Sequence, residues 1–206
     1  MSNKKTAQSA YCRYVKRLLD IFFSFVLLLL LLPIMIVIGA AIRVESSGGA
    51  IFKQKRIGRN RKEFVCFKFR TMVINAPKNV PASKLYDQEK YITKVGRLLR
   101  RSSLDELPQL FNVLKGDMSL VGPRPLIFEE SEMHAKRESE GIYVLRPGLT
   151  GLAQIKGRNL LADDEKIEND RFYLENIKIQ LDARILLSTL GCVLTGKGIT
   201  STNIKK

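Results

Sequence analysis

The sequence has few of the residues that build most metal centres and nucleophilic triads. It has no tryptophan, one histidine (His134) and three widely separated cysteines, Cys12, Cys66 and Cys192. One histidine excludes a zinc site with several histidine ligands, and any Ser-His-Asp triad would depend on it. Because His134 stands in an acidic, polar stretch, we expect an exposed side chain. The odd, scattered cysteines give neither a disulfide framework nor a metal-ligand spacing, which indicates a reducing compartment, and we expect Cys66 and Cys192 to be buried.

Acidic residues are scarce in the first half of the chain. The 206 residues carry a net charge of +15, and the hydrophobic content of 45% is sufficient for one folded domain. Residues 1–103 hold 21 lysines and arginines against 5 aspartates and glutamates, whereas residues 104–206 hold 14 against 15. The basic excess therefore lies in the first half, and it favours an anionic partner such as lipid headgroups, phosphates or nucleic acid.

Charged residues are absent from 21–42, between Asp20 and Arg43. At about 1.5 Å per residue, a helix of this length extends about 33 Å, which is enough to cross the hydrocarbon core of a bilayer. Six consecutive leucines at 27–32 exceed what a soluble helix requires. The run is too long for a cleavable signal peptide and leads straight into Arg43. We therefore predict a membrane-embedded segment.

Two topologies are open for this segment. Pro33 at its middle removes a backbone hydrogen bond and favours a kink. Basic residues flank both ends, so the positive-inside rule gives no clear orientation to a span. A helix that breaks at Pro33 and re-enters the cytoplasmic face fits both features, and we favour it. The alternative is an ordinary spanning anchor that tolerates the proline, because neighbouring groups can re-satisfy the freed carbonyl.

The remaining residues predict strands and helices without an internal repeat. Residues 51–57 and 64–72 are expected to form a β-hairpin, because apolar side chains alternate with other side chains in the second segment. The polar, proline-containing segment 73–92 indicates a loop, and the glycine-rich segment 146–154 indicates another. Helices are expected at 94–101, 103–116, 128–140, 164–178 and 180–195. The helix at 128–140 is expected to be solvated, and the last is apolar enough to pack or to lie on a membrane.

Two adjacent carboxylates, Asp105 and Glu106, stand where an amphipathic helix is expected to begin. Ser103 and Glu106 match a capping box, Pro108 is tolerable only near the first turn, and the helix ends at Gly116. The helix dipole would keep at least one carboxylate ionised, and such a group attacks phosphorus when cations neutralise the substrate. Mg²⁺ would bind the two carboxylates together with phosphate oxygens. The alternative is structural, with Glu106 capping the helix and Asp105 favouring its dipole.

Basic side chains are numerous enough to bind a charged substrate. Arg124, Arg146 and Arg158 stand beside glycine or proline, and rigid turns preset the arginine fork for bidentate bonds to phosphate. The alternative is a basic face for lipid headgroups, which requires no such rigidity. The candidates for phosphate contact are Lys68, Arg70, Arg97, Arg100, Arg101, Arg124, Arg146 and Arg158.

Five motifs in a fixed order resemble those of one protein family. They lie at 68–72, 103–119, 122–125, 146–154 and 157–159. They closely resemble the bacterial sugar transferase family, the monotopic polyprenyl-phosphate phosphoglycosyl transferases, and the likeness runs from about residue 16 to about residue 194. Larger members add membrane helices and a sugar-binding region, so this chain looks like the minimal catalytic form.

The resemblance implies a ping-pong reaction. In such enzymes the first acid of the Asp-Glu pair, here Asp105, attacks the β-phosphate of a UDP-sugar and releases UMP, and polyprenyl phosphate then takes the sugar phosphate from the enzyme. By the same likeness Glu106 assists Asp105, Mg²⁺ lies against the carboxylate and the diphosphate, and Arg124 binds phosphate. The other positions that the likeness places at the substrate are Arg70, Arg100, Gln154, Arg158 and Asn159.

The resemblance also supports an expected organisation and location. We expect a flexible basic N-terminus at 1–15, a re-entrant membrane helix at 16–45, a catalytic domain at 46–195 and a polar tail at 196–206. This is an α+β fold in which a β-hairpin accompanies a mainly helical domain with interfacial amphipathic helices. The domain would lie on the cytoplasmic face of the bacterial inner membrane and use a UDP-sugar and polyprenyl phosphate, with undecaprenyl phosphate as the expected acceptor. Membrane lipid and downstream glycosyltransferases are the other expected partners, while the sugar and the oligomeric state stay open.

One departure from the family concerns the membrane segment. Many relatives have Ser-Pro at the break, whereas this sequence has Leu32 before Pro33. A serine hydroxyl would satisfy a freed backbone group, so this chain must stabilise the segment in another way.

Two other functions are consistent with parts of the sequence. A membrane-tethered nucleic-acid-binding module would use the basic first half, with Phe64, Phe67 and Phe69 stacking on bases. The lack of tryptophan and the balanced charge of the second half disfavour it, so we expect no nucleic-acid partner. An inactive scaffold for other glycan-assembly enzymes would not need the Asp-Glu pair and the arginine turns.

Overall fold

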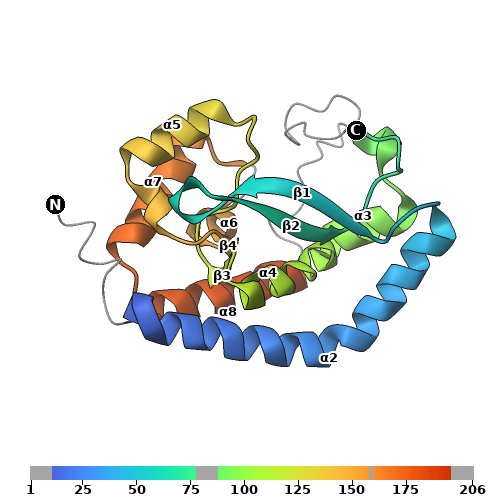
Figure 1. The fold of residues 1–206 in the computed structure, drawn as a ribbon, viewed down its shortest axis with the longest axis horizontal. Helices are drawn as coiled ribbons and strands as arrows, with labels where there is room; N and C mark the ends of the chain where they lie inside the picture. Colours follow the sequence, from blue (N-terminus) through green and yellow to red (C-terminus); the bar gives the residue numbers. More distant parts are fainter. Residues whose placement is uncertain (1–10, 78–87, 158–159, 196–206) are drawn as a thin grey trace.

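The protein combines helices with two small sheets, as expected of an α+β fold (Figure 1). The computed structural model describes residues 11–77, 88–157 and 160–195. The strands are β1 (Ile51–Ile57), β2 (Glu63–Phe69), β3 (Ser119–Val121) and β4 (Gly148–Thr150). The helices are α2 (Lys16–Glu45), α3 (Lys94–Ser102), α4 (Gln109–Lys115), α5 (Ser131–Ser139), α6 (Leu152–Lys156), α7 (Asp163–Glu175) and α8 (Ile179–Thr195). The short helical turns are η1 (Tyr11–Val15), η2 (Arg59–Arg61), η4 (Gln88–Tyr91), η5 (Leu104–Glu106) and η6 (Ile142–Val144).

The apolar helix α2 runs without interruption through Pro33. In Figure 1 it lies along one edge of the molecule and bends near its middle. The expected break is therefore a bend within a continuous helix, because the proline removes one hydrogen bond and the flanking turns keep theirs. Most of its side chains are apolar and face outward, Leu30 being 69% exposed and Val37 68% exposed. With a mean hydropathy of 3.2 in its most apolar part, α2 is long and apolar enough to cross a membrane.

The N-terminal end of α2 is bonded to the last helix of the domain. Asp182 on α8 accepts hydrogen bonds from Tyr11 at 2.7 Å, from Lys16 at 2.6 Å and from Tyr173 at 2.6 Å. The Lys16 and Asp182 side chains are 14% and 7% exposed. Residues 11–15 are therefore helical and attached, in contrast to the flexible N-terminus expected there, because a buried carboxylate requires these donors.

The next turn of α2 is bonded to α4 and β3. Arg17 donates to two carbonyl oxygens in the last turn of α4, at 2.6 and 2.8 Å. The buried Asp20 carboxylate accepts from the Ser119 hydroxyl at 3.1 Å and from the Leu120 N–H at 3.0 Å. Arginine bonds to the last carbonyls of a helix satisfy groups that the helix itself leaves free. This end of the membrane segment is thus fixed by charged side chains.

The C-terminal end of α2 is bonded to the same domain. The Glu45 carboxylate accepts from the first two N–H groups of α3, at 2.6 and 3.0 Å. Arg70, which follows β2, donates to the carbonyl oxygen of Ser46 at 2.7 Å and also to that of Ser47. Both ends of α2 therefore hold positions on one folded unit.

The hairpin of β1 and β2 forms as predicted, with antiparallel strands. The second strand ends at Phe69 rather than at residue 72. Helix α4 attaches to it through Asn112, which is fully buried. Its Oδ1 accepts from the Phe67 N–H at 3.0 Å, and its Nδ2 donates to the Val65 carbonyl at 2.7 Å. One side chain thus satisfies the free edge of the strand as a neighbouring strand would.

The second sheet pairs β3 and β4 in parallel, with Val121 opposite Thr150. Residues 146–154, expected to be a loop, contribute β4 and the short helix α6. A Cβ at Gly148 would lie 2.1 Å from the Gly122 nitrogen. Glycine therefore permits close approach of two backbones here, and the glycine content did not indicate a loop.

Two further local predictions are wrong. Ser103 does not cap a helix, since it has a φ of 57°, ends α3 and makes no capping bond, and α4 begins only at Gln109. His134 is 5% exposed rather than a surface side chain. Its Nε2 lies 2.8 Å from the Ile127 carbonyl, and its Nδ1 contacts the Tyr143 hydroxyl. Because both ring nitrogens have partners, the imidazole is buried without an orphaned polar group.

The other helices follow the predictions closely. The expected helices at 94–101, 164–178 and 180–195 form as α3, α7 and α8. The helix expected at 128–140 is α5, but it also buries Met133 and Arg137. Cys66 is buried as expected, whereas Cys192 is only partly buried.

We predict that Asp182→Asn destabilises the protein. The change leaves Lys16 without its anionic partner and weakens the acceptor of two tyrosine hydroxyls. Breaking such a buried pair costs about 3–5 kcal/mol. Thermal unfolding in detergent measures the fall in the midpoint, with Asp164→Asn as the control because that side chain is 84% exposed. Equal midpoints for the two variants would contradict the prediction.

Candidate active site

The two candidate carboxylates lie on the turn η5, between α3 and α4. Lys68 on β2 donates from Nζ to Glu106 Oε1 at 2.6 Å, and Arg124 Nη1 lies 3.7 Å from the same oxygen. The Lys68 and Glu106 side chains are 19% and 20% exposed, so their pair is largely shielded from water. Glu106 is thus engaged by two cations.

The neighbouring Asp105 differs from Glu106 in its contacts and in its pKa. Within the residues that the structure describes, its carboxylate has no hydrogen bond or ion pair. Burial raises the pKa of Asp105 to about 6, and the charge of Glu106 adds to the rise, whereas Lys68, Arg100 and Arg124 lower it. The carboxylate is therefore mainly ionised at neutral pH and more basic than an ordinary aspartate.

The groups that favour the ionised form of Asp105 differ from the predicted helix dipole. Because α4 begins at Gln109, beyond the dyad, surrounding cations rather than a helix dipole favour the ionised form of Asp105. Arg100 is one of them. Its Nε donates to the Thr71 hydroxyl at 2.9 Å. Burial lowers the pKa of Arg100, and the Asp105 charge opposes that decrease.

The turn 122–125, which carries Arg124, is fixed at three successive carbonyl oxygens. They accept from the Gly148 N–H at 2.8 Å, from Arg137 at 2.7 Å and from Arg56 at 2.9 Å. Arg137 is itself held in a buried ion pair with Asp170 at 2.6 Å. The backbone of the turn is therefore preset, so that the Arg124 guanidinium needs little reorganisation to bind an anion.

Three predicted phosphate-binding residues lie elsewhere. Arg70 is bonded to the carbonyl groups at the end of α2, and Arg146 Nε donates at 3.0 Å to the carbonyl oxygen that ends α4. Gln154 is 8% exposed on α6, and its Oε1 has no partner in the described part of the chain. Arg158 and Asn159 lie outside the described residues. The structure thus brings Lys68, Arg100 and Arg124 to the dyad, and it uses two other arginines on helix ends.

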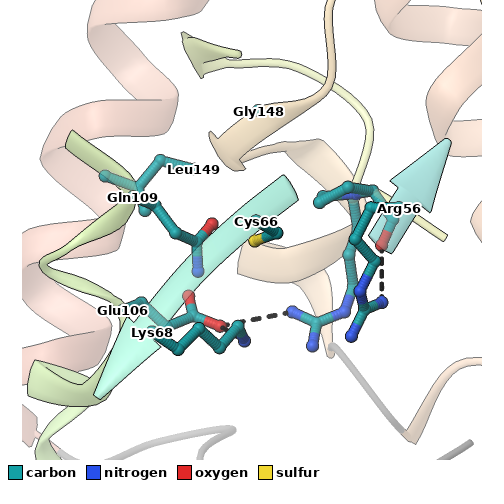
Figure 2. Close-up of a pocket in the computed structure, with 9 residues that line it drawn as sticks. Arg56, Cys66, Lys68, Glu106, Gln109, Gly148 and Leu149 are labelled. Atoms are coloured by element: carbon teal, nitrogen blue, oxygen red, sulfur yellow. Dashed lines mark hydrogen bonds and ion pairs between the residues drawn. The ribbon is translucent and has the colours of Figure 1, made fainter. Parts of the chain in front are cut away.

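A small pocket beside Glu106 includes residues that the motifs did not single out (Figure 2). Its lining residues are Arg56, Cys66, Lys68, Glu106, Gln109, Arg124, Pro125, Gly148 and Leu149. The hairpin register pairs Arg56 with Phe64 and Gln54 with Cys66, so these side chains share one face with Lys68. Strand alternation in β1, combined with this register, was the signal that could have identified Arg56. Burial raises the pKa of the Cys66 thiol, which keeps it protonated and inert.

The donor set fits a metal ion only in part. No group of three or more His, Cys, Asp or Glu side chains is placed to hold a metal among the described residues. Mg²⁺ commonly takes one or two protein carboxylates, with substrate phosphates and water completing its shell. Asp105 fits that role, whereas Glu106 is engaged by Lys68. The residues therefore fit an ion shared with a phosphorylated substrate and do not fit an all-protein site.

Fold and site together describe a membrane-associated enzyme whose cations surround one free carboxylate. The family model for bacterial sugar transferase matches residues 11–196, and the chain belongs to that family. An uncharacterized sugar transferase EpsL of Bacillus subtilis is 40% identical over 189 residues, which cover 92% of each chain.

Two further relatives have more specific names. A UDP-glucose:undecaprenyl-phosphate glucose-1-phosphate transferase of Klebsiella pneumoniae is 42% identical over 186 residues, 85% of this chain and 39% of that protein. An undecaprenyl-phosphate galactose phosphotransferase of Salmonella typhimurium is 39% identical over 200 residues, 90% of this chain and 42% of that protein. The chain thus spans less than half the length of these two relatives.

We predict that Asp105→Asn raises thermal stability at neutral pH. The folded-state pKa of about 6 exceeds the ordinary 3.8, so ionisation costs no stability below about pH 3.8 and costs most above pH 6. Asparagine does not ionise, and the unfolding midpoint of the variant relative to wild type should therefore rise between pH 4.5 and 7.5. The exposed control Asp164→Asn should show no such trend. A difference that is independent of pH would mean that Asp105 is not perturbed in this way.

Proposed function

We propose that this protein transfers a sugar 1-phosphate from a UDP-sugar to a membrane polyprenyl phosphate and releases UMP. The proposal rests on a difference between the two carboxylates. Glu106 is paired with Lys68, whereas Asp105 lies near cations without a bonded partner among the described residues. A free carboxylate attacks phosphorus when nearby cations neutralise the phosphate oxygens. The names of the Klebsiella and Salmonella relatives support undecaprenyl phosphate as the acceptor, in a first membrane step of glycan assembly.

The proposed reaction consists of two displacements at one phosphorus. In the first, a carboxylate oxygen of Asp105 bonds to the β-phosphorus of the UDP-sugar, the bond from that phosphorus to the bridging oxygen breaks, and the electron pair leaves with UMP. In the second, an oxygen of polyprenyl phosphate bonds to the same phosphorus, and the acyl phosphate bond breaks with its electron pair returning to Asp105. The products are UMP and a polyprenyl-diphosphate-sugar, and the carboxylate is regenerated.

Glu106 has a positioning role in this proposal. Its carboxylate holds Lys68 and lies 3.7 Å from Arg124, so it orients two cations beside the reacting phosphate. Its negative charge also raises the pKa of Asp105, which makes that carboxylate a stronger nucleophile once ionised.

Mg²⁺ belongs to the proposal as an ion shared between Asp105 and the substrate diphosphate. When bound, the ion would neutralise charge on the leaving phosphate. Because Glu106 is engaged by Lys68, we assign Glu106 to orienting cations rather than to binding the metal.

We infer that α2 enters and leaves the bilayer on the same side. Arg17 and Asp20 bond its first turns to the domain, and Glu45 and Arg70 bond its last turn to the same domain. A span would need its two ends on opposite sides of a hydrocarbon core about 30 Å thick. Basic residues near both ends favour the cytoplasmic face, which supports a place on the bacterial inner membrane.

Exposed apolar side chains outside α2 support contact with the lipid. They include Leu98 on α3, Phe111 on α4, and Leu187 and Leu190 on α8, which are 65%, 49%, 69% and 60% exposed. Helices α3 and α4 pack against α2, and α8 packs against α6 and the strands β3 and β4. These helices would lie at the interface as amphipathic elements.

The structure gives no support to the nucleic-acid alternative. Of the three phenylalanines considered for base stacking, Phe64 is 8% exposed and Phe69 is 3% exposed, which leaves only the half-buried Phe67. Buried rings cannot form a stacking platform on the basic hairpin.

We expect Asp105→Asn to reduce UMP release from a UDP-sugar by about 1,000-fold or more, because the amide lacks the attacking charge. The measurement is UMP release with Mg²⁺ over a small panel of UDP-sugars. Wild-type protein quenched after UDP-sugar alone should carry the mass of one sugar phosphate, and the variant should carry none. Asp164→Asn should match wild type. Turnover retained by Asp105→Asn would remove this residue from the mechanism.

We expect both ends of α2 to be shielded from the outside of the cell. Tyr14 and Val44 flank the helix and are 62% and 89% exposed, so single Tyr14→Cys and Val44→Cys variants suit labelling after the native Cys12, Cys66 and Cys192 are replaced. A membrane-impermeant maleimide should label neither site on intact cells and both after permeabilisation. Labelling of either site from outside would show a spanning helix.

A further inference from the structure

Arg56 forms no ion pair with a carboxylate in the described part of the chain. Its Nη1 donates to the Pro125 carbonyl at 2.9 Å and its Nη2 to Gln54 Oε1 at 2.6 Å, both neutral acceptors. Its Nε is buried and has no hydrogen-bond partner among the residues that the structure describes. Burial lowers the pKa of Arg56 and the charge of Arg124 lowers it further, whereas the charges of Glu130 and Glu106 oppose the decrease. An arginine still remains protonated under these conditions, so the site holds a positive charge whose direct hydrogen-bond partners are neutral.

This charge faces the pocket of the dyad. Arg56 lines the same pocket as Lys68, Glu106 and Arg124, and the Arg124 charge is close enough to act on its guanidinium. Three cations thus surround one carboxylate in the lining. The pocket lining is therefore net positive and complementary to the anionic phosphate oxygens of a nucleotide-sugar.

A structural role alone does not account for a guanidinium at this position. Holding the Pro125 carbonyl requires one N–H donor, which a neutral amide supplies as well. The positive charges of Arg56 and Arg124 in one pocket lining repel each other, which costs stability unless an anion joins them. The arrangement is therefore best explained by an anion that is present only during the reaction.

We propose that Arg56 is a second phosphate-binding guanidinium, which with Arg124 holds the phosphoryl group that passes from the nucleotide-sugar to Asp105 and then to the acceptor. The inference rests on the proposed function. Because this phosphoryl group is the one part of the substrates present in both displacements, Arg56 acts in both. The same two guanidinium groups stabilise the charge on its oxygens each time.

The test measures the two half-reactions separately with the full chain in detergent. The first is UMP release in a single turnover with UDP-sugar alone. The second is the loss of the isolated phosphosugar enzyme after polyprenyl phosphate is added. Arg56→Gln keeps a donor for the Pro125 carbonyl without the charge, and Arg56→Lys keeps the charge without the fork. Lys55→Gln is the matched control. It removes one positive charge from the same strand, and the Lys55 side chain is 78% exposed.

We expect Arg56→Gln to slow both half-reactions by about 100-fold, the usual effect of removing one donor to a developing charge. Arg56→Lys should slow both half-reactions about tenfold, since a single ammonium charge replaces the bidentate guanidinium. Lys55→Gln should stay within about twofold of wild type. If Arg56→Gln fails to fold, as judged by thermal unfolding, Arg56→Lys against Lys55→Gln decides the question.

Three results would overturn the assignment. They are wild-type rates for the Arg56 variants, a loss confined to one half-reaction, or equal losses for Arg56→Gln and Arg56→Lys. Failure of wild type and Lys55→Gln to release UMP or to form the phosphosugar enzyme would instead refute the proposed function. The two failures are therefore distinguishable.

Discussion

The ion pair between Lys68 and Glu106 determines how the rest of the site is arranged. Two adjacent carboxylates would otherwise share the nearby cations, and neither would be available to a substrate. The pair engages Glu106 at 2.6 Å and leaves Asp105 without a partner among the described residues. Glu106 still acts on its neighbour, because its charge adds to the effect of burial on the pKa of Asp105. In the proposed mechanism, Glu106 is held in place so that Asp105 stays available to the substrate.

The arginines of this protein serve two purposes with one chemical group. Arg17 and Arg70 donate their forks to carbonyl oxygens at helix ends, where the backbone leaves acceptors free. Arg100 and Arg124 lie instead beside the carboxylates of the dyad. The net charge of +15 is therefore not a single basic surface. Some of the basic side chains bond the apolar helix to the domain, and others lie around the Asp105–Glu106 site.

Sequence patterns predicted the elements whose signals are local. The uncharged run predicted α2, strand alternation predicted the hairpin, and the motifs placed Asp105 beside Lys68 and Arg124. The failures required information from outside the local sequence. An arginine fork binds carbonyl oxygens as well as phosphate, so Arg146 could not be assigned from its glycine and proline neighbours. Arg56 needed the strand register, which pairing in three dimensions sets.

The position of the dyad also depends on the apolar helix. The turn that carries Asp105 lies between α3 and α4. Glu45 at one end of α2 bonds α3, and Arg17 at the other end bonds α4. A shift of either end of α2 would therefore move one side of this turn against the other. In the proposed re-entrant topology the same bonds set the height of the carboxylate above the lipid. A polyprenyl phosphate has its headgroup at a fixed depth, so in the proposed mechanism rigid attachment of the helix would bring the Asp105 carboxylate and the acceptor to one level.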